Sequence, residues 1–231
     1  MTDRPILFSG SMIRALLAGT KTQTRRVLRA KPGMTIADAT VDAGPACGGI
    51  GRRLELPVDK LKVPYAVGDR LYVRERVACG ACAPGKPSHW APSFWRREQG
   101  TPKNPNGLWY EADGLGPEYP ITERGRWVQG MHMPRWASRL TLIVAEVRVQ
   151  RLQDIDEVDA RAEGIKPEEH DDGRIIFPVP GHDDHANTAK GAYRKLWNGL
   201  NEARGFGWDV NPWIVAVTFT VEHCNIARST T

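Results

Sequence analysis

One short segment near the start of the chain combines residue types that can perform acyl transfer. The residues Gly19-Thr20-Lys21-Thr22-Gln23-Thr24-Arg25-Arg26 bring together one lysine, three threonines and two arginines. A threonine hydroxyl becomes a nucleophile when a base removes its proton, and a lysine kept neutral by partial burial can be that base. If the segment is a turn or the start of a helix, Lys21 and Thr24 lie three residues apart and face each other.

The two arginines bear on the same chemistry. If Arg25 and Arg26 lie close to Lys21, their charges lower its pKa, and their guanidinium groups can bind an anionic or carbonyl oxygen. The alternative is a Thr-rich basic turn at the surface, because short Lys/Thr/Arg turns are common. The spacing alone leaves both interpretations open.

Glu75 is the second candidate for chemistry. Residues 70–77 alternate in the manner of a strand, and Glu75 shares one face with Leu71 and Val73. A carboxylate on an apolar face is costly unless it is paired, so we expect Lys21 or Arg26 as its partner. A structural ion pair, or a strand end at which Glu75 reaches water, is the alternative.

Hydrophobic periodicity and capping residues predict the elements that position these groups. We expect helices over 11–18, from the capping box at 154–157 to Gly164, and over 186–204. We expect strands over 70–77, 107–112, 139–152 and 213–221. Because these strands lack a regular βαβ rhythm, the sequence predicts an α+β fold: a small mixed β-barrel or curled sheet with flanking helices.

Length and composition agree with one globular unit. The 231 residues are 41% hydrophobic and 26% charged, and we predict a single domain over 1–231. Two long loop insertions are expected at about 79–107 and 166–187, where Gly, Pro and polar residues cluster. With no apolar run of roughly 18 residues and no secretory signal, we expect no membrane contact and a cytoplasmic location.

The charge balance favours a phosphate-bearing or nucleic-acid partner. The formal net charge is +5, and 23 of the 32 basic residues are arginine. Arginine matches phosphate in shape and stacks on bases. A solvated basic surface is the alternative.

The cysteine and histidine patterns do not point to a cofactor. Cys79-Gly-Ala-Cys82 is a lone CxxC, whereas a structural zinc site needs two further ligands. His170, His182 and His185 lie among aspartates without helical His-x-x-x-His spacing. We therefore expect no metal and no cofactor.

Several segments together resemble the ASCH domain family, a branch of the PUA-like β-barrels. The resemblance runs through residues 4–8, 13–25, 67–75 and 133–139, the long strand to Leu152, the helix ending at 162–164, and residues 208–217. It extends over about two-thirds of the chain and does not cover the two insertions. Its core is the pattern Gly-x-Lys-x-x-Thr-x-Arg, present here as Gly19, Lys21, Thr24 and Arg26. The later segments resemble the longer, phage-associated members.

The resemblance implies a function. Members of this family bind RNA or nucleotides, and some remove the acetyl group from N(4)-acetylcytidine and related acylated cytosines. By this likeness Lys21 is the base, Thr24 the nucleophile and Glu75 the carboxylate that holds Lys21. Arg26 or backbone N–H groups would stabilise the oxyanion. The candidate contacts for the substrate are Arg25, Arg26, Phe8, Tyr72 and Trp136.

Three hypotheses follow from the sequence. The first is an amidohydrolase that converts an N(4)-acylated cytosine nucleoside to cytidine and a carboxylic acid, through an acyl-enzyme or through a water activated by Glu75. The second is a non-catalytic module that binds RNA or nucleotides. The third is a ribonuclease that uses the same cleft. The oligomeric state stays open.

Overall fold

A curled five-stranded mixed sheet is the centre of the molecule. The computed structural model describes residues 2–28, 63–79, 108–114, 127–170 and 172–229, and the backbone of 34–36 and 54–56. The strand order is β1-β5-β8-β12-β2. These strands are β1 (Asp3–Leu7), β5 (Arg70–Arg74), β8 (Thr141–Arg151), β12 (Trp213–Glu222) and β2 (Gln23–Val27). Only the β1–β5 pair is parallel within this sheet; the other neighbours are antiparallel.

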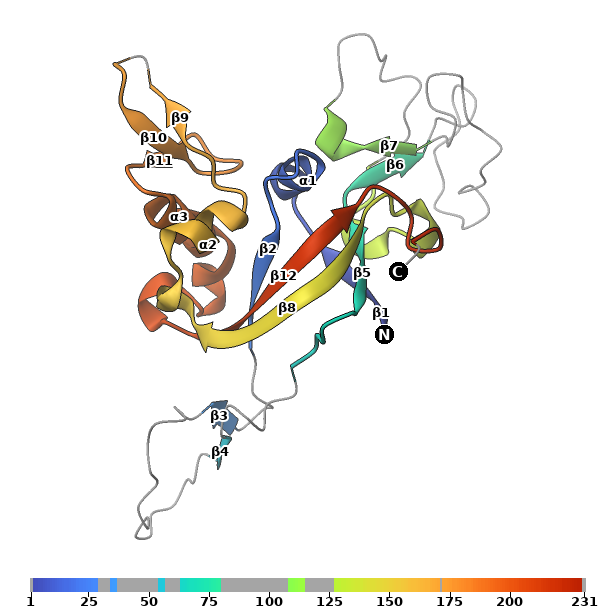
Figure 1. Ribbon diagram of the computed structural model, residues 1–231, viewed down its shortest axis with the longest axis horizontal. Helices are drawn as coiled ribbons and strands as arrows, with labels where there is room; N and C mark the ends of the chain where they lie inside the picture. The colour runs from blue at the N-terminus through green and yellow to red at the C-terminus, as the bar shows by residue number, and fades with distance from the viewer. Residues whose placement is uncertain are drawn as a thin grey trace.

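In the described part of the chain, three helices and three small sheets accompany this sheet (Figure 1). The helices are α1 (Gly10–Leu17), α2 (Glu157–Ala162) and α3 (Ala189–Asn201). The small sheets pair β3 (Met34–Ile36) with β4 (Leu54–Leu56), β6 (Val77–Cys79) with β7 (Leu108–Tyr110), and β10 (Ile175–Pro178) with both β9 (Glu168–Glu169) and β11 (His185–Ala186). Short 3-10 turns lie at Glu111–Asp113, Gly130–His132, Arg135–Ala137, Leu152–Asp154, Glu202–Arg204 and Trp208–Val210.

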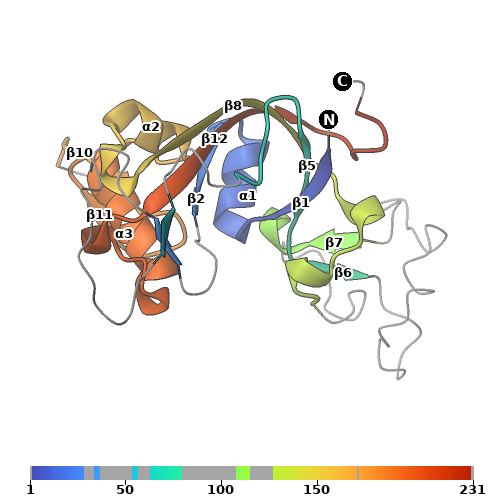
Figure 2. The same cartoon turned by 90° about the horizontal axis from the view of Figure 1, so that it is seen from below.

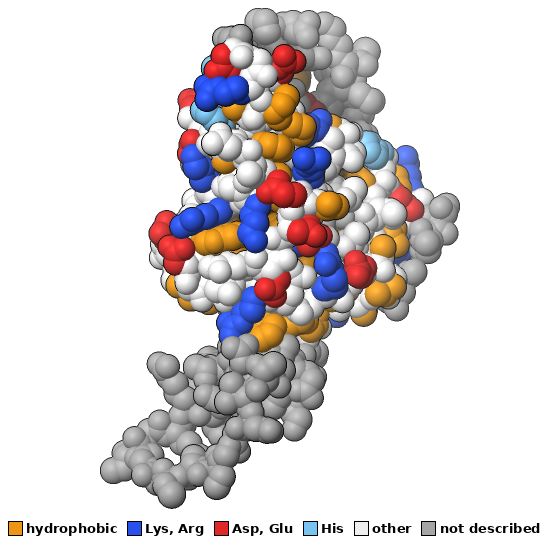
Figure 3. Space-filling model, turned by 60° about the vertical axis from the view of Figure 1, so that its left-hand side comes forward, with side chains coloured by type: hydrophobic (Ala, Val, Ile, Leu, Met, Phe, Trp, Pro, Cys, Tyr) orange, Lys and Arg blue, Asp and Glu red, His pale blue; other side chains and the backbone are white. Residues whose placement is uncertain are grey.

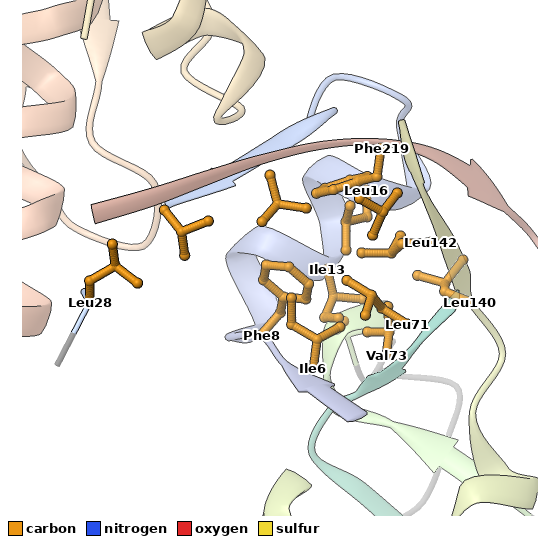
Figure 4. Close-up of a cluster of buried hydrophobic side chains, with 14 residues drawn as sticks. Ile6, Phe8, Ile13, Leu16, Leu28, Leu71, Val73, Leu140, Leu142 and Phe219 are labelled. Atoms are coloured by element: carbon orange, nitrogen blue, oxygen red, sulfur yellow. The ribbon is translucent and has the colours of Figure 1, made fainter. Parts of the chain in front are cut away.

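The sheet curls around α1, which connects β1 to β2 (Figure 2). Ile13 and Leu16 of this helix are fully buried against apolar side chains of β1, β5, β8 and β12. Figure 4 shows these side chains converging, with Leu28 lying apart at the far end of β2. The helix is short because Gly19, at a φ of 68°, ends it as the sequence predicts.

The opposite side of β12 carries a second core. Ile214 and Ala216 pack there against buried residues of α3, including Ala192, Leu196 and Trp197. Apolar residues on both faces of β12 explain its nearly continuous hydrophobic sequence. The predicted α+β class is confirmed. Within the described residues the edge strands β1 and β2 do not pair with each other.

The structure corrects several sequence expectations. Residues 23–27 form a strand rather than a turn or helical start, because they pair with the strongly apolar β12. Residues three apart in a strand project to opposite faces, so helical spacing does not bring Lys21 and Thr24 together. The predicted loop at 166–187 contains the small sheet of β9, β10 and β11. The helix α1 begins at Gly10, one residue before the predicted start, with Ser9 as its N-cap, and the N-cap of α2 is Asp156.

Other expectations agree with the structure or concern residues outside the described ranges. Residues 141–151 form one long strand, and its pairing with β12 shifts register between Thr218 and Phe219. The predicted strand at 70–77 divides into β5 and β6. Almost all of the insertion at 79–107 lies outside the described residues, as does Cys82. In the part of the chain that is described, no helix is long and apolar enough to cross a bilayer.

Replacing Leu16 with alanine tests the core inside the curled sheet. Leu16 has no exposed surface, so we expect the substitution to lower the free energy of unfolding by about 2–5 kcal/mol through lost burial and a residual cavity. Urea denaturation measures this. Val158→Ala on α2 is the control: this valine is 75% exposed, and the expected change is within about 0.5 kcal/mol. Equal effects of the two substitutions would contradict the placement of α1.

Candidate functional site

Lys21 is fully buried two residues before the start of β2. Its Nζ donates to Glu163 Oε2 at 2.6 Å and to the Glu163 carbonyl oxygen at 2.9 Å. The two residues also form an isolated antiparallel bridge. An ammonium group has three donors, so two of them are used within the described residues. The contact joins the start of β2 to the end of α2, 142 residues later in the chain.

A second cation shares the same carboxylate. Arg25 donates from Nη1 to Glu163 Oε1 at 3.2 Å and from Nη2 to Asp159 Oδ2 at 2.5 Å. Gln23 accepts from the same Nη1 at 2.5 Å. Lys21, Gln23 and Arg25 alternate along the extended chain, so their side chains lie on one side of it and meet α2. Both oxygens of Glu163 are thus held by cations.

Burial and neighbouring charges decide the protonation of these groups. Burial lowers the pKa of Lys21; Glu163 opposes this, whereas the charges of Arg26 and Arg25 add to it, and the pKa falls below its ordinary value. Burial tends to raise the pKa of Asp159, but the hydrogen bond from Arg148 and the charge of Arg25 outweigh it and lower that pKa. Lys21 is therefore a cation of this cluster whose surroundings favour its neutral form more than water does.

Phe8 lies between two of the cations. Lys21 Nζ is 5.7 Å from the centroid of the Phe8 ring, and Arg26 Cζ is 5.1 Å from it. Arg26 also donates from Nη2 to the carbonyl oxygen of Leu7 at 2.8 Å. Cation–π contacts of this kind stabilise positive charge beside an aromatic face. The ring therefore belongs to the predicted cluster, although it is buried.

Thr24 lines a cavity of about 270 Å³ beside this cluster. Glu163 lines the same cavity, which we call the Thr24 cavity. Its aromatic walls are Tyr193 and Trp197 of α3, both buried. Within the described residues the Thr24 hydroxyl makes no hydrogen bond, so it is free to meet a ligand. The remaining lining residues are Met12, Arg25, Arg26, Val27, Leu196, Leu200, Asn201 and Arg204.

The Thr24 cavity lies at the open edge of the sheet. Four consecutive residues of β2, 24–27, line it. Successive side chains of a strand point to opposite faces of the sheet, so a cavity on one face alone would contact only every second residue. Leu28 N donates to Trp213 O, and Phe219 N donates to Thr22 O. The alternation of an antiparallel ladder then turns the N–H and C=O of Arg25 away from β12, toward the open edge. Backbone donors and acceptors are therefore available there.

Arg25 brings a further unmet donor. Its Nε is buried and has no hydrogen-bond partner in the part of the chain that is described. Buried polar groups are normally paired, so an unpaired one at a cavity wall indicates a place for a ligand acceptor.

A second cavity of about 420 Å³ adjoins the first. Met12, Arg26 and Leu200 line both of them. We call the second one the Arg76 cavity; Phe8, Ser9, Gly10 and Glu111 are also part of its wall, together with Leu7, Gln129, Gly130 and Met131. Volumes of this order are at the lower end of those that hold small organic ligands.

Glu75 does not join Lys21. It is buried and accepts two hydrogen bonds from Arg139, at 2.9 and 3.0 Å. Its backbone N–H contacts Met133 Sδ at 3.3 Å, and Arg139 also pairs with Asp113 at 2.7 Å. The expectation that Lys21 or Arg26 pairs with Glu75 is therefore wrong, and the alternative of a structural ion pair is what the structure shows. The physical reason is that Arg139, which precedes β8, reaches the carboxylate at the end of β5.

Two further candidates also lie elsewhere. Tyr72 is stacked beneath Arg74 and Arg135, with Cζ-to-centroid distances of 5.4 and 5.8 Å, and Trp136 is 44% exposed on a 3-10 turn. Neither lines the Thr24 or the Arg76 cavity. Among the residues described, no group of three or more His, Cys, Asp or Glu side chains could hold a metal ion.

Sequence reasoning missed Glu163, Asp159 and Tyr193. One signal was present: Glu163 is the C-cap residue of α2, and a carboxylate is unfavourable at the negative end of a helix unless cations compensate it. The next residue, Gly164, has a φ of 100°, and a Cβ there would lie 3.1 Å from Ala15 Cβ and 3.4 Å from Lys21 Cβ. A glycine is thus needed for α2 to approach Lys21 this closely.

Replacing Arg139 with methionine tests the Glu75 pair. Burial raises the pKa of Glu75 above its ordinary value even with Arg139 present. Without the guanidinium a buried carboxylate is left unpaired at neutral pH, so we expect a loss of about 3 kcal/mol in the free energy of unfolding. Because the folded-state pKa is raised, the carboxyl becomes neutral as the pH falls through it, and the loss shrinks at acidic pH. Chemical denaturation at neutral and mildly acidic pH measures both.

Arg174→Met is the control for this test, since Arg174 is an exposed partner of Asp172. We expect no measurable change at either pH. A loss in Arg139→Met that does not depend on pH would argue against an ionised Glu75 in the folded protein.

Comparison of the chain with protein-family models, with curated proteins and with solved structures found no match.

Proposed function

We propose that this protein is an amidohydrolase that removes the acyl group from an N(4)-acylated cytosine nucleoside. One observation carries the proposal: Glu163, which holds a fully buried lysine of lowered pKa, shares the wall of one cavity with the unengaged hydroxyl of Thr24. In this proposal the carboxylate that holds Lys21 is Glu163, in place of Glu75, to which the family resemblance gives that role. Lys21 and Thr24 keep the roles that the sequence suggests.

The reaction requires Thr24 to attack the acyl carbon. Because Lys21 does not line the Thr24 cavity, the proposal requires a water molecule to relay the proton from Thr24 Oγ1 to Lys21 as the new C–O bond forms. The tetrahedral intermediate expels the exocyclic nitrogen, which receives that proton from Lys21, so cytidine leaves as the neutral amine. Water then attacks the acyl-threonine ester while Lys21 again moves one proton. The carboxylic acid leaves and the Thr24 hydroxyl is restored.

The oxyanion needs donors that point into the cavity. The backbone N–H of Arg25 on the open edge of β2, its unpaired Nε and the guanidinium of Arg26 are the candidates. Fixed donors around a developing negative charge give one of the largest contributions to catalysis. The same edge offers a C=O acceptor beside the N–H donor, which complements the mixed donors and acceptors along the edge of cytosine.

Direct activation of water by a carboxylate is the less favoured route. Both oxygens of Glu163 accept hydrogen bonds from Lys21 and Arg25, which leaves them poorly placed to take a proton from water. Glu75 is engaged by Arg139 and lines neither cavity. We therefore assign Glu163 the positioning of Lys21.

The proposal includes the finer fold assignment, a PUA-like barrel of the ASCH type. The curl of the five strands around α1 supports it, and the hydrogen bond from Arg26 in β2 to the carbonyl oxygen of Leu7 in β1 joins the two edges.

A non-catalytic module that binds RNA or nucleotides is the second candidate, favoured by the arginine content. On the face presented in Figure 3, however, basic and acidic side chains are interspersed, whereas proteins that track a nucleic-acid backbone gather basic groups on one face. A ribonuclease would use the same arginines near a phosphodiester. Turnover of a nucleoside that contains no phosphate separates amide hydrolysis from both alternatives.

Substitution of Thr24 tests the nucleophile. Incubation with N(4)-acetylcytidine, followed by the ultraviolet change to cytidine, should show turnover by the wild type. We expect Thr24→Ala and Lys21→Met to lose roughly a thousandfold or more in kcat, because nucleophile and base act as one unit, and Thr24→Ser to keep part of the activity. Thr22→Ala is the matched control, since Thr22 is exposed two residues away. Absence of wild-type turnover would overturn the proposal; full activity of Thr24→Ala would overturn the mechanism.

The pH profile tests the role of Lys21. Because the neutral amine is the active form, kcat/KM should rise with pH until it passes the lowered pKa of Lys21. Arg26→Gln removes a positive charge that lowers this pKa, so the rising limb should move to higher pH. Glu163→Gln removes the charge that raises it, so the limb should move to lower pH while the maximum falls. A limb that stays fixed in both variants would exclude Lys21 as the titrating base.

A further inference from the structure

The Arg76 cavity is not used by the proposed reaction. It adjoins the Thr24 cavity across Met12, Arg26 and Leu200, which line both. A ligand whose acylated base fills the Thr24 cavity therefore extends over Arg26 into the second one. The side chains that line the Arg76 cavity therefore determine which chemical group can be attached to the ribose of the ligand.

Two guanidinium groups face this second space. Arg26 uses one N–H for the carbonyl oxygen of Leu7, and its other donors make no hydrogen bond to the residues that the structure describes. Arg76 pairs with Glu111 at 2.6 Å, and the two side chains are 41% and 39% exposed. Ion pairs exposed to this degree contribute little to stability. An anionic ligand can therefore replace Glu111 as the partner of Arg76.

Phosphate is the anion that suits this arrangement. A guanidinium group presents two parallel N–H donors that match two phosphate oxygens, and hydrogen bonds between such charged groups are short and strong. Ser9 and Gly10, at the start of α1, are part of the same wall, where a helix N-terminus adds to the positive potential of the two arginines. The remaining wall is neutral apart from Glu111.

We infer that the Arg76 cavity is a subsite for a phosphate joined to the ribose of the substrate, bound by Arg26 and Arg76. This inference rests on the proposed function for its choice of a cytosine ligand. It extends that function from nucleosides to nucleotides, whether the phosphate is a terminal monoester or the link to a neighbouring nucleotide. It also gives Glu111 a role, as a carboxylate that competes with the phosphate for Arg76.

Equilibrium binding of reaction products tests the subsite without relying on turnover. Calorimetry compares cytidine, cytidine 5′-monophosphate and the dinucleotide CpC on the intact protein. At low salt we expect the wild type to bind at least one phosphate-bearing ligand about tenfold more tightly than cytidine, an advantage that falls as salt is added. The monophosphate and dinucleotide arms distinguish a terminal from a bridging phosphate.

Substitutions in opposite directions make the test specific. Arg76→Met should remove most of the ratio between phosphate-bearing ligand and cytidine, whereas Glu111→Gln should increase that ratio by freeing Arg76. Arg194→Met makes the same charge change at an exposed pair with Asp209, which lines neither cavity, and should leave the ratio unchanged. Glu111→Gln also covers the case in which Arg76→Met fails to fold.

Equal affinity of the wild type for cytidine and both phosphate-bearing ligands would overturn the subsite, and so would a ratio that Arg76→Met and Glu111→Gln leave unchanged. Failure of the subsite is distinguishable from failure of the proposed function. If N(4)-acetylcytidine is hydrolysed but phosphate gives no advantage, only the subsite is wrong. If phosphate-dependent binding occurs without hydrolysis, only the amidohydrolase proposal is wrong.

Discussion

The buried ion pair between Lys21 and Glu163 is the interaction on which the site depends. It fastens the beginning of β2 to the end of α2, and burying two charges is tolerable only because further polar contacts satisfy them. Arg25 supplies one such contact at Glu163, and the Glu163 carbonyl oxygen supplies another at Lys21. The network adds to the apolar packing of Ala160 and the hydrogen bond from Thr22 N to Ala162 O, which also hold α2 against the edge strand. Glu163 in turn forms part of the wall of the Thr24 cavity.

The same interaction sets two opposing demands on one lysine. Removal from water favours the neutral amine, while the adjacent carboxylate favours the ammonium form. The proposed reaction asks this same lysine to take a proton and later return it. Phe8 adds a flat surface that tolerates either state. In the proposed function, this cluster serves proton transfer.

Hydrophobic periodicity and capping residues predicted the helices and strands whose formation depends on neighbouring residues in the sequence. The helix ended by Gly19 and the long apolar strands β8 and β12 follow from periodicity and capping, and the α+β class follows from their order. The chemistry of residues 19–26 was recognisable from residue types alone. Its backbone conformation was not, because pairing with β12 decided it. The carboxylate beside Lys21 was misassigned for a similar reason: Glu75 and Glu163 are both buried, and only tertiary packing assigns Arg139 to the first and Lys21 to the second.

Because the Thr24 cavity lies at a strand edge, some of the groups that can bind a ligand there belong to the main chain and do not change when side chains are substituted. Main-chain N–H and C=O groups are present whatever side chain stands at a position, so no single substitution in β2 deletes them, except one to proline. Under the proposed function, affinity for the polar edge of cytosine would thus survive extensive change in the surrounding residues. Discrimination between acyl groups would fall to the shape set by Tyr193 and Trp197 on α3, and variants of that helix would change which acyl group fits while the base stays the same.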